Sequence, residues 1–590
     1  MIPTSRKEVE ALGWDWIDVI FFTGDAFVDH PSFGTAVLAR WLQKNGYRVA
    51  VVPQPNWRDD LRDFRKLGAP RLFFGVNAGA MDSMVNHYTA SKRLRHDDAY
   101  TPDGKAGARP DYAVTVYTRI LKEMYPDIPV VIGGIAASLR RFTHYDYWKD
   151  ALVPSVLVSS GADYLAYGMG EKVILELSRA LESRRNPREM RKIPQIAFFS
   201  TGKPKVPEGG ILLHSYEECL ADKVKFATNY RTIETEANLM HPSVLVEPVG
   251  EGYVQVNPPF PPPTTAEMDS FSDLPYTKLP HPRYKGKRIP AYDMIKFSVC
   301  IHRGCFGGCN FCTLALHQGR FISSRSPESV LKEVRALVNH PEFAGNISDV
   351  GAPSANMYGL HGKDASLCGK CRRTSCLFPA RCPNMDTDHS RLLDLYRRID
   401  AVKGIRHSYV SSGIRYDLFL GPDGFLDQSS YPYLKEVMLK HTSGRLKVAP
   451  EHTEDSVLKY LGKPSFRLFV RLRDEFDRIN AEAGTHVGLV PYFISGHPGC
   501  TMNDMERLSR NPALRGLFME QVQDFTPTPM TTSSVMYYTG IDPRTMKPVF
   551  VERDLDKKRA QKSFFFKKSG KLVPNKKKSS IIAPHKRHKN

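Results

Sequence analysis

Short apolar segments alternate with amphipathic segments over the first 245 residues of the chain. Apolar residues recur at helical spacing over 34–45 and again over 136–142, which predicts two helices. The apolar runs that predict buried strands are 17–23, 47–52, 71–76, 129–132 and 155–159. Buried strands that alternate with helices are typical of a parallel sheet with helices on both faces. The pattern therefore predicts an open, doubly wound α/β domain over residues 1–245.

A proline-rich segment, 246–290, separates this domain from a second alternation of strands and helices over 291–556. Repeated prolines exclude a helix or a central strand and so indicate a linker. In the second part the spacing predicts a helix over 326–339. The predicted strands are 347–350, 407–411, 445–449, 488–494 and 520–525. This alternation predicts a full or partial (β/α) barrel, in which the chemistry lies at the carboxyl ends of the strands.

The formal net charge of +20 is concentrated at the end of the chain. From Lys557 onward there are thirteen Lys or Arg and no Asp or Glu, which leaves +7 for the preceding 556 residues. We predict that 557–590 is a basic disordered tail, with nucleic acid as its candidate partner. The chain begins without the apolar stretch of a secretory signal and has no run long enough to span a bilayer. We therefore expect a cytoplasmic protein with no membrane partner.

Seven of the ten cysteines fall in two groups between residues 305 and 382, which indicates metal binding in a reducing compartment. The first group, Cys305, Cys309 and Cys312, has the spacing C-x3-C-x2-C. Three thiolates on one loop can bind three irons of a [4Fe–4S] cubane and leave the fourth iron open to a small molecule. A zinc knuckle, or a cluster with a remote fourth ligand, is the alternative. Cys300, just upstream, is interpreted as a buried small side chain.

The second group lies in a Cys-rich insertion at 364–390, within the predicted barrel. Its members are Cys368, Cys371, Cys376 and Cys382. The insertion has little apolar material to fold around, so a bound metal would supply its stability. Zinc and an auxiliary Fe–S cluster are equally compatible with four cysteines at this spacing.

An aromatic residue, Phe311, directly precedes the last cysteine of the first group and completes the signature C-x3-C-x-φ-C. The segments that carry a wider likeness are SVCIHRGCFGGCNFCTLALHQGRFISSRSPESV, DVGAPSANMYG, SSGIRYD, LKVAPEHT, VPYFISGHPG and DFTPTPMTTSSVMYYTG. On these residues nearly the whole chain resembles the YgiQ-like family of the radical S-adenosylmethionine (SAM) superfamily. The resemblance implies an enzyme whose cluster cleaves SAM reductively and begins radical chemistry, with an electron donor such as flavodoxin or ferredoxin. It names no substrate.

The resemblance also implies contacts with SAM from Phe311, Gly351, Arg415 and Gly496. Phe311 would lie beside the adenine and Gly351 near the methionine moiety, with Arg415 and Gly496 near the ribose, carboxylate or adenine. A surface ion pair explains Arg415 about as well. Glu451 and His452 directly follow a predicted strand, where a barrel presents acid–base groups, although a helix cap or a hydrogen bond explains them almost equally well.

An α/β domain ahead of a radical SAM barrel is similar to the arrangement of cobalamin-dependent radical SAM enzymes, and Gly133 and Gly134 suit such a domain. The D-x-H-x-x-G motif that supplies a lower axial histidine is absent, because the nearest stretch, 29–34, has the wrong spacing. We therefore disfavour cobalamin and leave open a form bound without that histidine. The alternative for the whole chain is a metal-stabilised RNA-binding protein, which leaves Phe311 unexplained.

Overall fold

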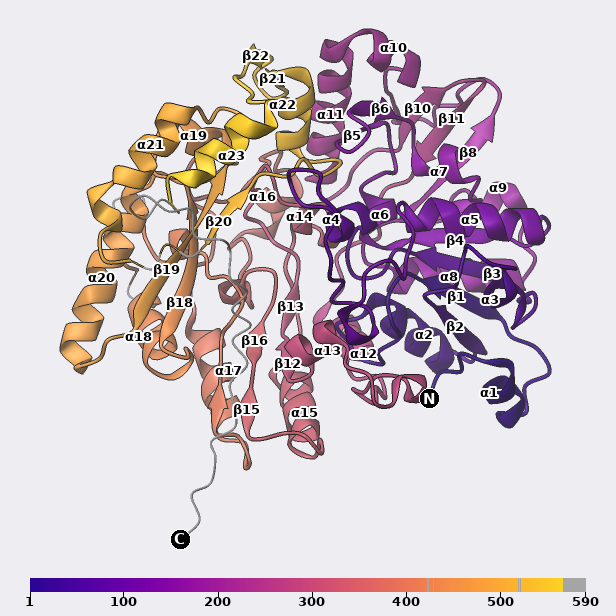
Figure 1. Cartoon of the computed structure of the whole chain (residues 1–590), viewed down its shortest axis with the longest axis horizontal. Helices are drawn as coiled ribbons and strands as arrows, with labels where there is room; N and C mark the ends of the chain where they lie inside the picture. Colours follow the sequence, from indigo (N-terminus) through magenta and orange to yellow (C-terminus); the bar gives the residue numbers. More distant parts are fainter. Residues whose placement is uncertain (422–423, 428, 518, 520, 566–590) are drawn as a thin grey trace.

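The computed structural model describes residues 1–565 except 422–423, 428, 518 and 520. Two lobes lie side by side (Figure 1). The first is built on the amino-terminal sheet, and the second on the strands and helices that follow residue 297.

A nine-stranded sheet forms the centre of the first lobe, in the order β2-β1-β3-β4-β7-β8-β11-β10-β9. Its strands are β1 (Val19–Thr23), β2 (Val49–Pro53), β3 (Phe73–Asn77), β4 (Val130–Gly133), β7 (Tyr164–Ala166), β8 (Ile196–Thr201), β9 (Ile211–Leu212), β10 (Leu245–Val249) and β11 (Gly252–Val256). The first five strands in this order are parallel. Their carboxyl ends, which include Thr23, Asn77 and Gly133, therefore share one edge of the sheet.

Helices cover both faces of this sheet, because successive side chains of a strand point to opposite faces. Ile20 and Phe22 of β1 pack in one core with α5, whereas Val19 and Phe21 pack in another with α2 and α8. The helices of this lobe are α1 (Arg6–Ala11), α2 (Gly34–Lys44), α3 (Arg62–Arg65), α4 (Ser83–His87), α5 (Ala113–Met124), α6 (Gly134–Ser138), α7 (Val156–Ser160), α8 (Glu171–Glu182), α9 (Pro187–Met190), α10 (Tyr216–Ala221) and α11 (Lys223–Ala237). The predicted doubly wound α/β sheet is confirmed.

Two details of the predicted first domain are wrong. The run 155–159 forms the helix α7 instead of a strand, because the Ser155 hydroxyl accepts a hydrogen bond from the Leu157 N–H at 3.2 Å and so caps a helical turn. The predicted domain boundary at residue 245 falls inside the sheet, since β10 pairs antiparallel with β11, and β11 pairs antiparallel with β8. The sheet therefore extends to Val256, and the linker begins after it.

The linker contains two helices where its prolines allow them. α12 (Thr265–Ser272) falls in a stretch without proline, and the Thr264 side chain caps it. α13 (Pro290–Ile295) has proline in its first turn, where the missing N–H costs no helical hydrogen bond.

Parallel strands form the centre of the second lobe and follow one another in chain order around an arc. They are β12 (Ser298–Cys300), β15 (Asn346–Ile347), β16 (Asp349–Gly351), β17 (His407–Ser408), β18 (Arg445–Glu451), β19 (Gly488–Ser495) and β20 (Gln521–Asp524). β12 pairs with β16, β15 with β17, β18 with β19 and β19 with β20, all in parallel. A parallel bridge joins Ile414 to Val448. This arc is the predicted partial (β/α) barrel.

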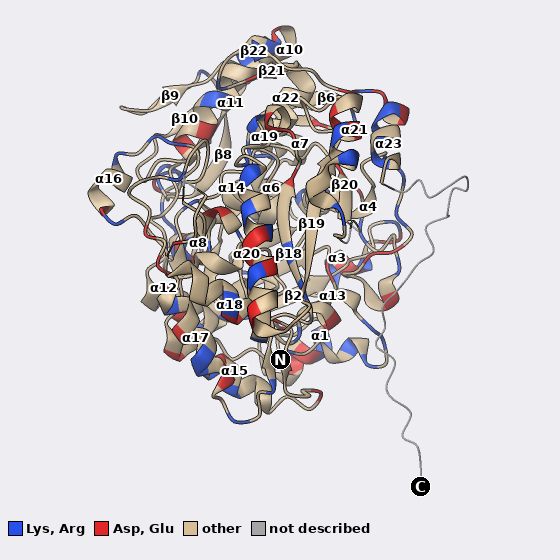
Figure 2. Cartoon of the chain, turned by 90° about the vertical axis from the view of Figure 1, so that its left-hand side faces the viewer, with Lys and Arg blue, Asp and Glu red and all other residues tan. Residues whose placement is uncertain are grey.

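Helices cover the outside of the arc and bury their apolar sides against it. The longer ones are α15 (Pro327–Val338), α17 (Ser390–Asp400), α18 (Ser430–Lys440), α19 (Asp455–Leu461), α20 (Arg467–Ala483) and α21 (Met502–Arg510). Shorter elements are α14 (Leu314–Gln318), α16 (Ala365–Gly369), α22 (Thr532–Thr539) and the hairpin of β13 (His302–Arg303) with β14 (Ser323–Ser324). Acidic and basic side chains mix along α20 (Figure 2). No helix among the described residues is long and apolar enough to cross a membrane.

The prediction of a disordered tail from residue 557 is wrong at its start. α23 (Leu555–Ser563) packs on the barrel, with Lys558 and Gln561 buried. Gln561 accepts a hydrogen bond from the Gly496 N–H at 2.8 Å. Most side chains of α23 are polar, so its sequence lacks the apolar period of a buried helix. The rest of the predicted tail, 566–590, and its expected contact with nucleic acid lie outside the described residues.

Candidate active site

One loop carries Cys305, Cys309 and Cys312, between β13 and α14. Its backbone is tied down at both ends, because the Cys305 N–H donates to the Gly319 carbonyl at 3.1 Å and the Asn310 N–H donates to the Leu461 carbonyl at 3.0 Å. Gly308 has φ of +62, a conformation that favours glycine. A Cβ there would lie 2.6 Å from the Cβ of Ser375. The loop therefore needs glycine to bend as it does.

A buried arginine faces these cysteines. Arg415 Nη1 donates to the Cys309 sulfur at 3.0 Å, and Arg415 Nε donates to Asp417 at 2.9 Å. Burial raises the pKa of the Cys305 thiol and raises that of Cys312 to about 12, so both are protonated at neutral pH without a metal. The ion pair of Arg415 with Asp417 is buried, which rules out the alternative of a surface pair for Arg415.

The donor set of this loop, three cysteine thiols, is of the kind that holds an iron–sulfur cluster. Among the described residues, no three His, Cys, Asp or Glu side chains are arranged to hold one metal ion, at either cysteine group. A cubane spreads its cysteines because each sulfur binds a different iron. Cys305, Cys309 and Cys312 lie on one wrapped loop and offer three soft thiolate ligands, and the next cysteine along the chain is Cys368. The chemistry of these three ligands thus suits an iron–sulfur cluster.

The residues expected to contact SAM have different neighbours in the structure. Gly351 ends β16 and faces Ser412 so closely that a Cβ would clash with its hydroxyl. Phe311 packs edge to face with His497, with ring centres 6.4 Å apart. Gly496 is covered by α23, since its N–H bonds to Gln561 and its Cα faces Lys558. The geometry therefore brings Arg415 to the cysteine loop, places Gly351 at the strand-end cavity described below and leaves Gly496 behind a helix.

Glu451 and His452 lie in different environments. Glu451 ends β18 with φ of +69, strained backbone of the kind that clusters at functional sites. Its carboxylate is buried 3.7 Å from Lys463 Nζ, and burial raises its pKa. His452 is fully buried and accepts a hydrogen bond from the Glu454 N–H, with its pKa lowered to about 3 by burial. Local hydrogen bonding thus accounts for His452.

The second cysteine group lies directly against the first. Ser375 donates to the Gly307 carbonyl at 2.7 Å, and the Cys376 N–H donates to the Phe306 carbonyl at 3.1 Å. Arg320 Nη2 donates to the Cys376 sulfur at 3.2 Å. Spacing alone did not predict this contact between the two groups. The insertion therefore supports the backbone of the first cysteine loop, whatever its own thiols bind.

Two cavities open beside the cysteine loop. The strand-end cavity, of about 490 Å³, lies between the carboxyl edge of the first sheet and the barrel. It is lined by Thr23, Asn77 and Gly133 on one side and by Cys300, Gly351 and Ser412 on the other. Cys300 is exposed, so the interpretation of it as a buried residue is wrong.

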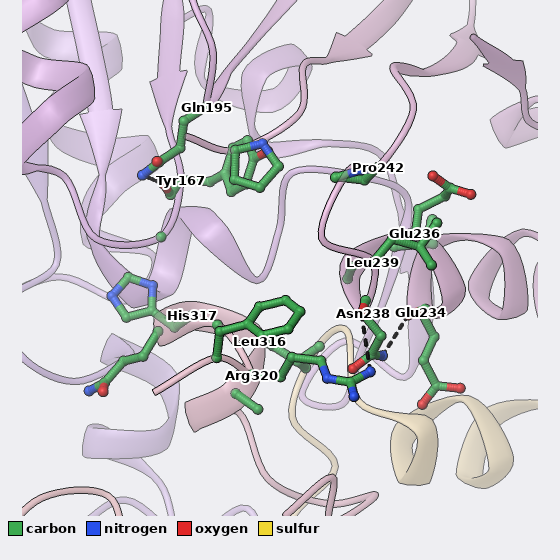
Figure 3. A pocket seen from close by; sticks show the side chains of 18 of the residues that line it. Tyr167, Gln195, Glu234, Glu236, Asn238, Leu239, Pro242, Leu316, His317 and Arg320 are labelled. Atoms are coloured by element: carbon green, nitrogen blue, oxygen red, sulfur yellow. Dashed lines mark hydrogen bonds between the residues drawn. The ribbon is translucent and has the colours of Figure 1, made fainter. Parts of the chain in front are cut away.

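The interdomain cavity, of about 200 Å³, lies on the other side of α14. Tyr167 and Gln195 of the first lobe face Leu316, His317 and Arg320 across it (Figure 3). Glu234, Glu236, Asn238 and Leu239 close it from the end of α11. Cys309 and Cys312 also line it. His317, which lines both cavities, is held near Ser138 Oγ at 3.2 Å, and burial lowers its pKa to about 4.

Sequence reasoning missed several of these residues. Asp417 follows Arg415 closely enough to have been suspected, and His317 follows the cysteine triplet on the next helix. Arg141 carried no signal, because only folding brings it to the cavity. His30, in the stretch compared with the cobalamin motif, is fully buried and accepts a hydrogen bond from the Ser32 N–H at 3.1 Å.

The amino-terminal half of the chain matches a family model. Residues 1–298 match the family described as radical SAM N-terminal, and residues 520–570 match a domain of unknown function, DUF3362. The cysteine triplet begins just after the first match. The second match covers β20, α22 and α23, which agrees with α23 being part of the folded chain. Fold and family match together make this chain a radical SAM protein.

Curated relatives show to which family of radical SAM proteins the chain belongs. A UPF0313 protein of Bacteroides thetaiotaomicron is 54% identical over 96% of this chain and 93% of its own length. One of Porphyromonas gingivalis is 55% identical over 96% of this chain and 90% of its own. The UPF0313 protein YgiQ of Salmonella typhimurium is 42% identical over 92% of this chain and 81% of its own. The chain belongs to the UPF0313 family, as its resemblance to the YgiQ-like family predicted.

Solved structures with related folds are more distant. The radical SAM methyltransferase TsrM of Kitasatospora setae, with cobalamin and a [4Fe–4S] cluster bound, aligns with a TM-score of 0.48 at 16% identity over 88% of this chain and 74% of its own. The cobalamin-dependent enzyme OxsB aligns with a TM-score of 0.47 at 12% identity over 93% of this chain and 56% of its own.

Proposed function

We propose that this protein is a radical SAM enzyme that holds a [4Fe–4S] cluster on Cys305, Cys309 and Cys312 and cleaves SAM. The observation that carries the proposal is the cysteine loop itself. Three closely spaced thiols lie on one loop, Arg415 donates to the Cys309 sulfur, and Cys309 and Cys312 line a cavity between the lobes. When bound, the cluster supplies one electron to SAM, which yields methionine and 5′-deoxyadenosine once hydrogen is taken from a substrate.

The chain's own residues hold this site together. Arg415 donates a hydrogen bond to the Cys309 sulfur, and Asp417 fixes the direction of the guanidinium. The Ser354 hydroxyl lies 3.8 Å from the Cys305 sulfur. Gly351 lets Ser412 and Asp349 pack closely against the end of β16.

In this proposal SAM lies between Gly351 and the cysteine loop, and Phe311 lies on the side of SAM that faces the barrel. Gly496 is left out of this proposal because α23 covers it. An electron donor such as flavodoxin or ferredoxin would reduce the cluster. For the second cysteine group we propose a metal, either zinc or an auxiliary Fe–S cluster. The strand-end cavity has a cofactor-sized volume, and it is where cobalamin would be sought.

The test is anaerobic reconstitution of the full chain with iron and sulfide, followed by reduction in the presence of SAM. We expect about four irons from the first group alone, and production of 5′-deoxyadenosine. In a protein lacking Cys368, Cys371, Cys376 and Cys382, the metal that is lost relative to the wild type identifies the second site. Stoichiometric zinc with no iron in the wild type would favour the RNA-binding alternative.

A further inference from the structure

The interdomain cavity contains two buried arginines that have no carboxylate partner. Arg141 has 5% of its surface exposed and Arg320 has 6%. Arg141 Nη1 donates to the Ser138 carbonyl at 2.7 Å, and its Nε has no partner. Arg320 donates to the Asn238 carbonyl (Figure 3), and it also donates to the Arg373 carbonyl and to the Cys376 sulfur. Within the described part of the chain, neither guanidinium forms an ion pair with Asp or Glu.

Most other charges at the cavity are paired. Arg303 pairs with Glu171 at 2.6 Å, Arg544 pairs with Glu234 at 2.6 Å, and Lys172 pairs with Glu267 at 2.7 Å. Glu236 also lines the cavity and accepts a hydrogen bond from the Ser243 N–H, with no ion pair among the described residues. With Arg141 and Arg320 counted against Glu236, one positive charge is left in excess in a partly enclosed space. A buried charge is costly unless it is paired, so an excess of this kind favours an anionic ligand.

The surroundings of Arg141 suit a planar or tetrahedral anion beside an apolar body. Its guanidinium lies 5.0 Å from the ring centre of Tyr167 and 5.6 Å from that of Phe142. Leu239 and Leu316 add apolar surface to the cavity wall. Without a counter-ion, burial lowers the pKa of Arg141. Arginine binds carboxylate and phosphate groups through paired N–H donors.

We infer that the interdomain cavity binds a small-molecule substrate through a carboxylate or phosphate group, which Arg141 and Arg320 recognise. The inference rests on the proposed function, because it makes this molecule the substrate of the radical reaction beside Cys309 and Cys312. The anionic group lies at the two arginines, and the apolar body lies along Leu239 and Leu316. The amino-terminal lobe thus selects the substrate, and the barrel performs the chemistry.

The test is the thermal unfolding of the full, anaerobically purified chain during titration with inorganic phosphate or acetate, with chloride keeping the ionic strength constant. The wild type is expected to show a saturable rise in melting temperature with at least one anion. Arg141→Met should lose that rise and melt at the same or a higher temperature than the wild type in chloride alone, because it removes an uncompensated buried charge. Arg141→Lys should keep part of the rise, and Arg179→Met, an exposed arginine on α8, should keep all of it.

Several results would overturn the inference. One is the absence of a saturable rise in the melting temperature of the wild type with either anion. Another is a rise in Arg141→Met that equals the rise in the wild type. If Arg141→Met does not fold, Arg320→Met takes its place, and an undiminished rise there counts against the inference. SAM binding to the wild type, measured by equilibrium dialysis with saturating phosphate, should be unchanged. Displacement of SAM would assign the site to the carboxylate of SAM instead. The melting data need no cluster, so they stand even if SAM cleavage fails.

Discussion

At the scale of single residues, Arg415 is the side chain that connects the cysteine loop to the barrel. It is buried, paired with Asp417 and bonded to the Cys309 sulfur. Arg415→Met should destabilise the protein by about 3–5 kcal/mol, because it leaves the buried Asp417 carboxylate without a partner. The double variant Arg415→Met with Asp417→Asn should recover much of this loss. Denaturant unfolding of the wild type, the two single variants and the double variant measures this double-mutant cycle. Additive losses of stability would contradict an energetic coupling between Arg415 and Asp417.

Glu247 makes stability depend on pH. It is 1% exposed, accepts a hydrogen bond from the Thr143 N–H, and has its pKa raised by burial from 4.5 to about 7. Folding therefore favours the protonated form: the wild type suffers no penalty below pH 4.5 and loses stability as the pH rises from there to about 7. The loss approaches about 3 kcal/mol above pH 7.

Glu247→Gln removes this titration and keeps an acceptor for Thr143. Relative to the wild type it should gain stability on going from pH 5 to pH 8, by roughly 2–3 kcal/mol. Unfolding free energies at several pH values measure the change, with Glu208→Gln as an exposed control. A difference between Glu247→Gln and wild type that stays constant across this range would show that Glu247 does not titrate there.

At the scale of elements, α23 is the last helix that the structure describes. Truncation after Asp556 removes the buried Lys558 and Gln561 and frees the Gly496 N–H, so we expect a clear loss of thermal stability. Truncation after Phe565 keeps the helix and serves as the matched control, with little change expected. Melting temperature and protease resistance measure both. Equal stability of the two truncated chains would mean that α23 contributes nothing to the fold.

The bend of the cysteine loop depends on Gly308. Gly308→Ala adds a Cβ that would meet Ser375 and the Thr374 carbonyl at 2.6 Å, in a backbone with φ of +62. Gly319→Ala is the matched control, since Gly319 has φ of +88 and open space around it. We expect Gly308→Ala to bind several-fold less iron per chain after reconstitution than Gly319→Ala. Similar iron contents in the two variants would show that metal binding does not depend on the bend at Gly308.

Elements with a strong periodic pattern could be predicted from the sequence, and elements held by tertiary contacts could not. The strands at 445–449 and 488–494 are found as β18 and β19 because long buried runs have few alternative structures. The run 155–159 became a helix because one cap at Ser155 outweighed an ambiguous pattern. α23 was missed because its burial depends on Gly496, far away in sequence.

At the scale of the whole molecule, the chain places two carboxyl strand edges opposite each other, with the cysteine loop at their junction. The motif C-x3-C-x-φ-C leads to the proposed metal ligands from local spacing alone. Arg141, Arg320 and the two cavities could not be predicted, because they come from different lobes and meet only when the lobes pack together. The proposed cluster ligands therefore depend on local sequence, and the proposed substrate contacts depend on the packing of the two lobes.

The central claim is that the three cysteines hold a cluster that cleaves SAM. The most direct measurement is the amount of 5′-deoxyadenosine formed by the anaerobically reconstituted, reduced protein, compared between Cys309→Ala and Cys300→Ala. Cys300 is the matched control, because it precedes the same loop and lies outside the proposed ligand set. We predict formation by the wild type and by Cys300→Ala, and at least a hundredfold loss in Cys309→Ala. Undiminished formation by Cys309→Ala, or none by a wild type that carries iron and sulfide, would contradict the account.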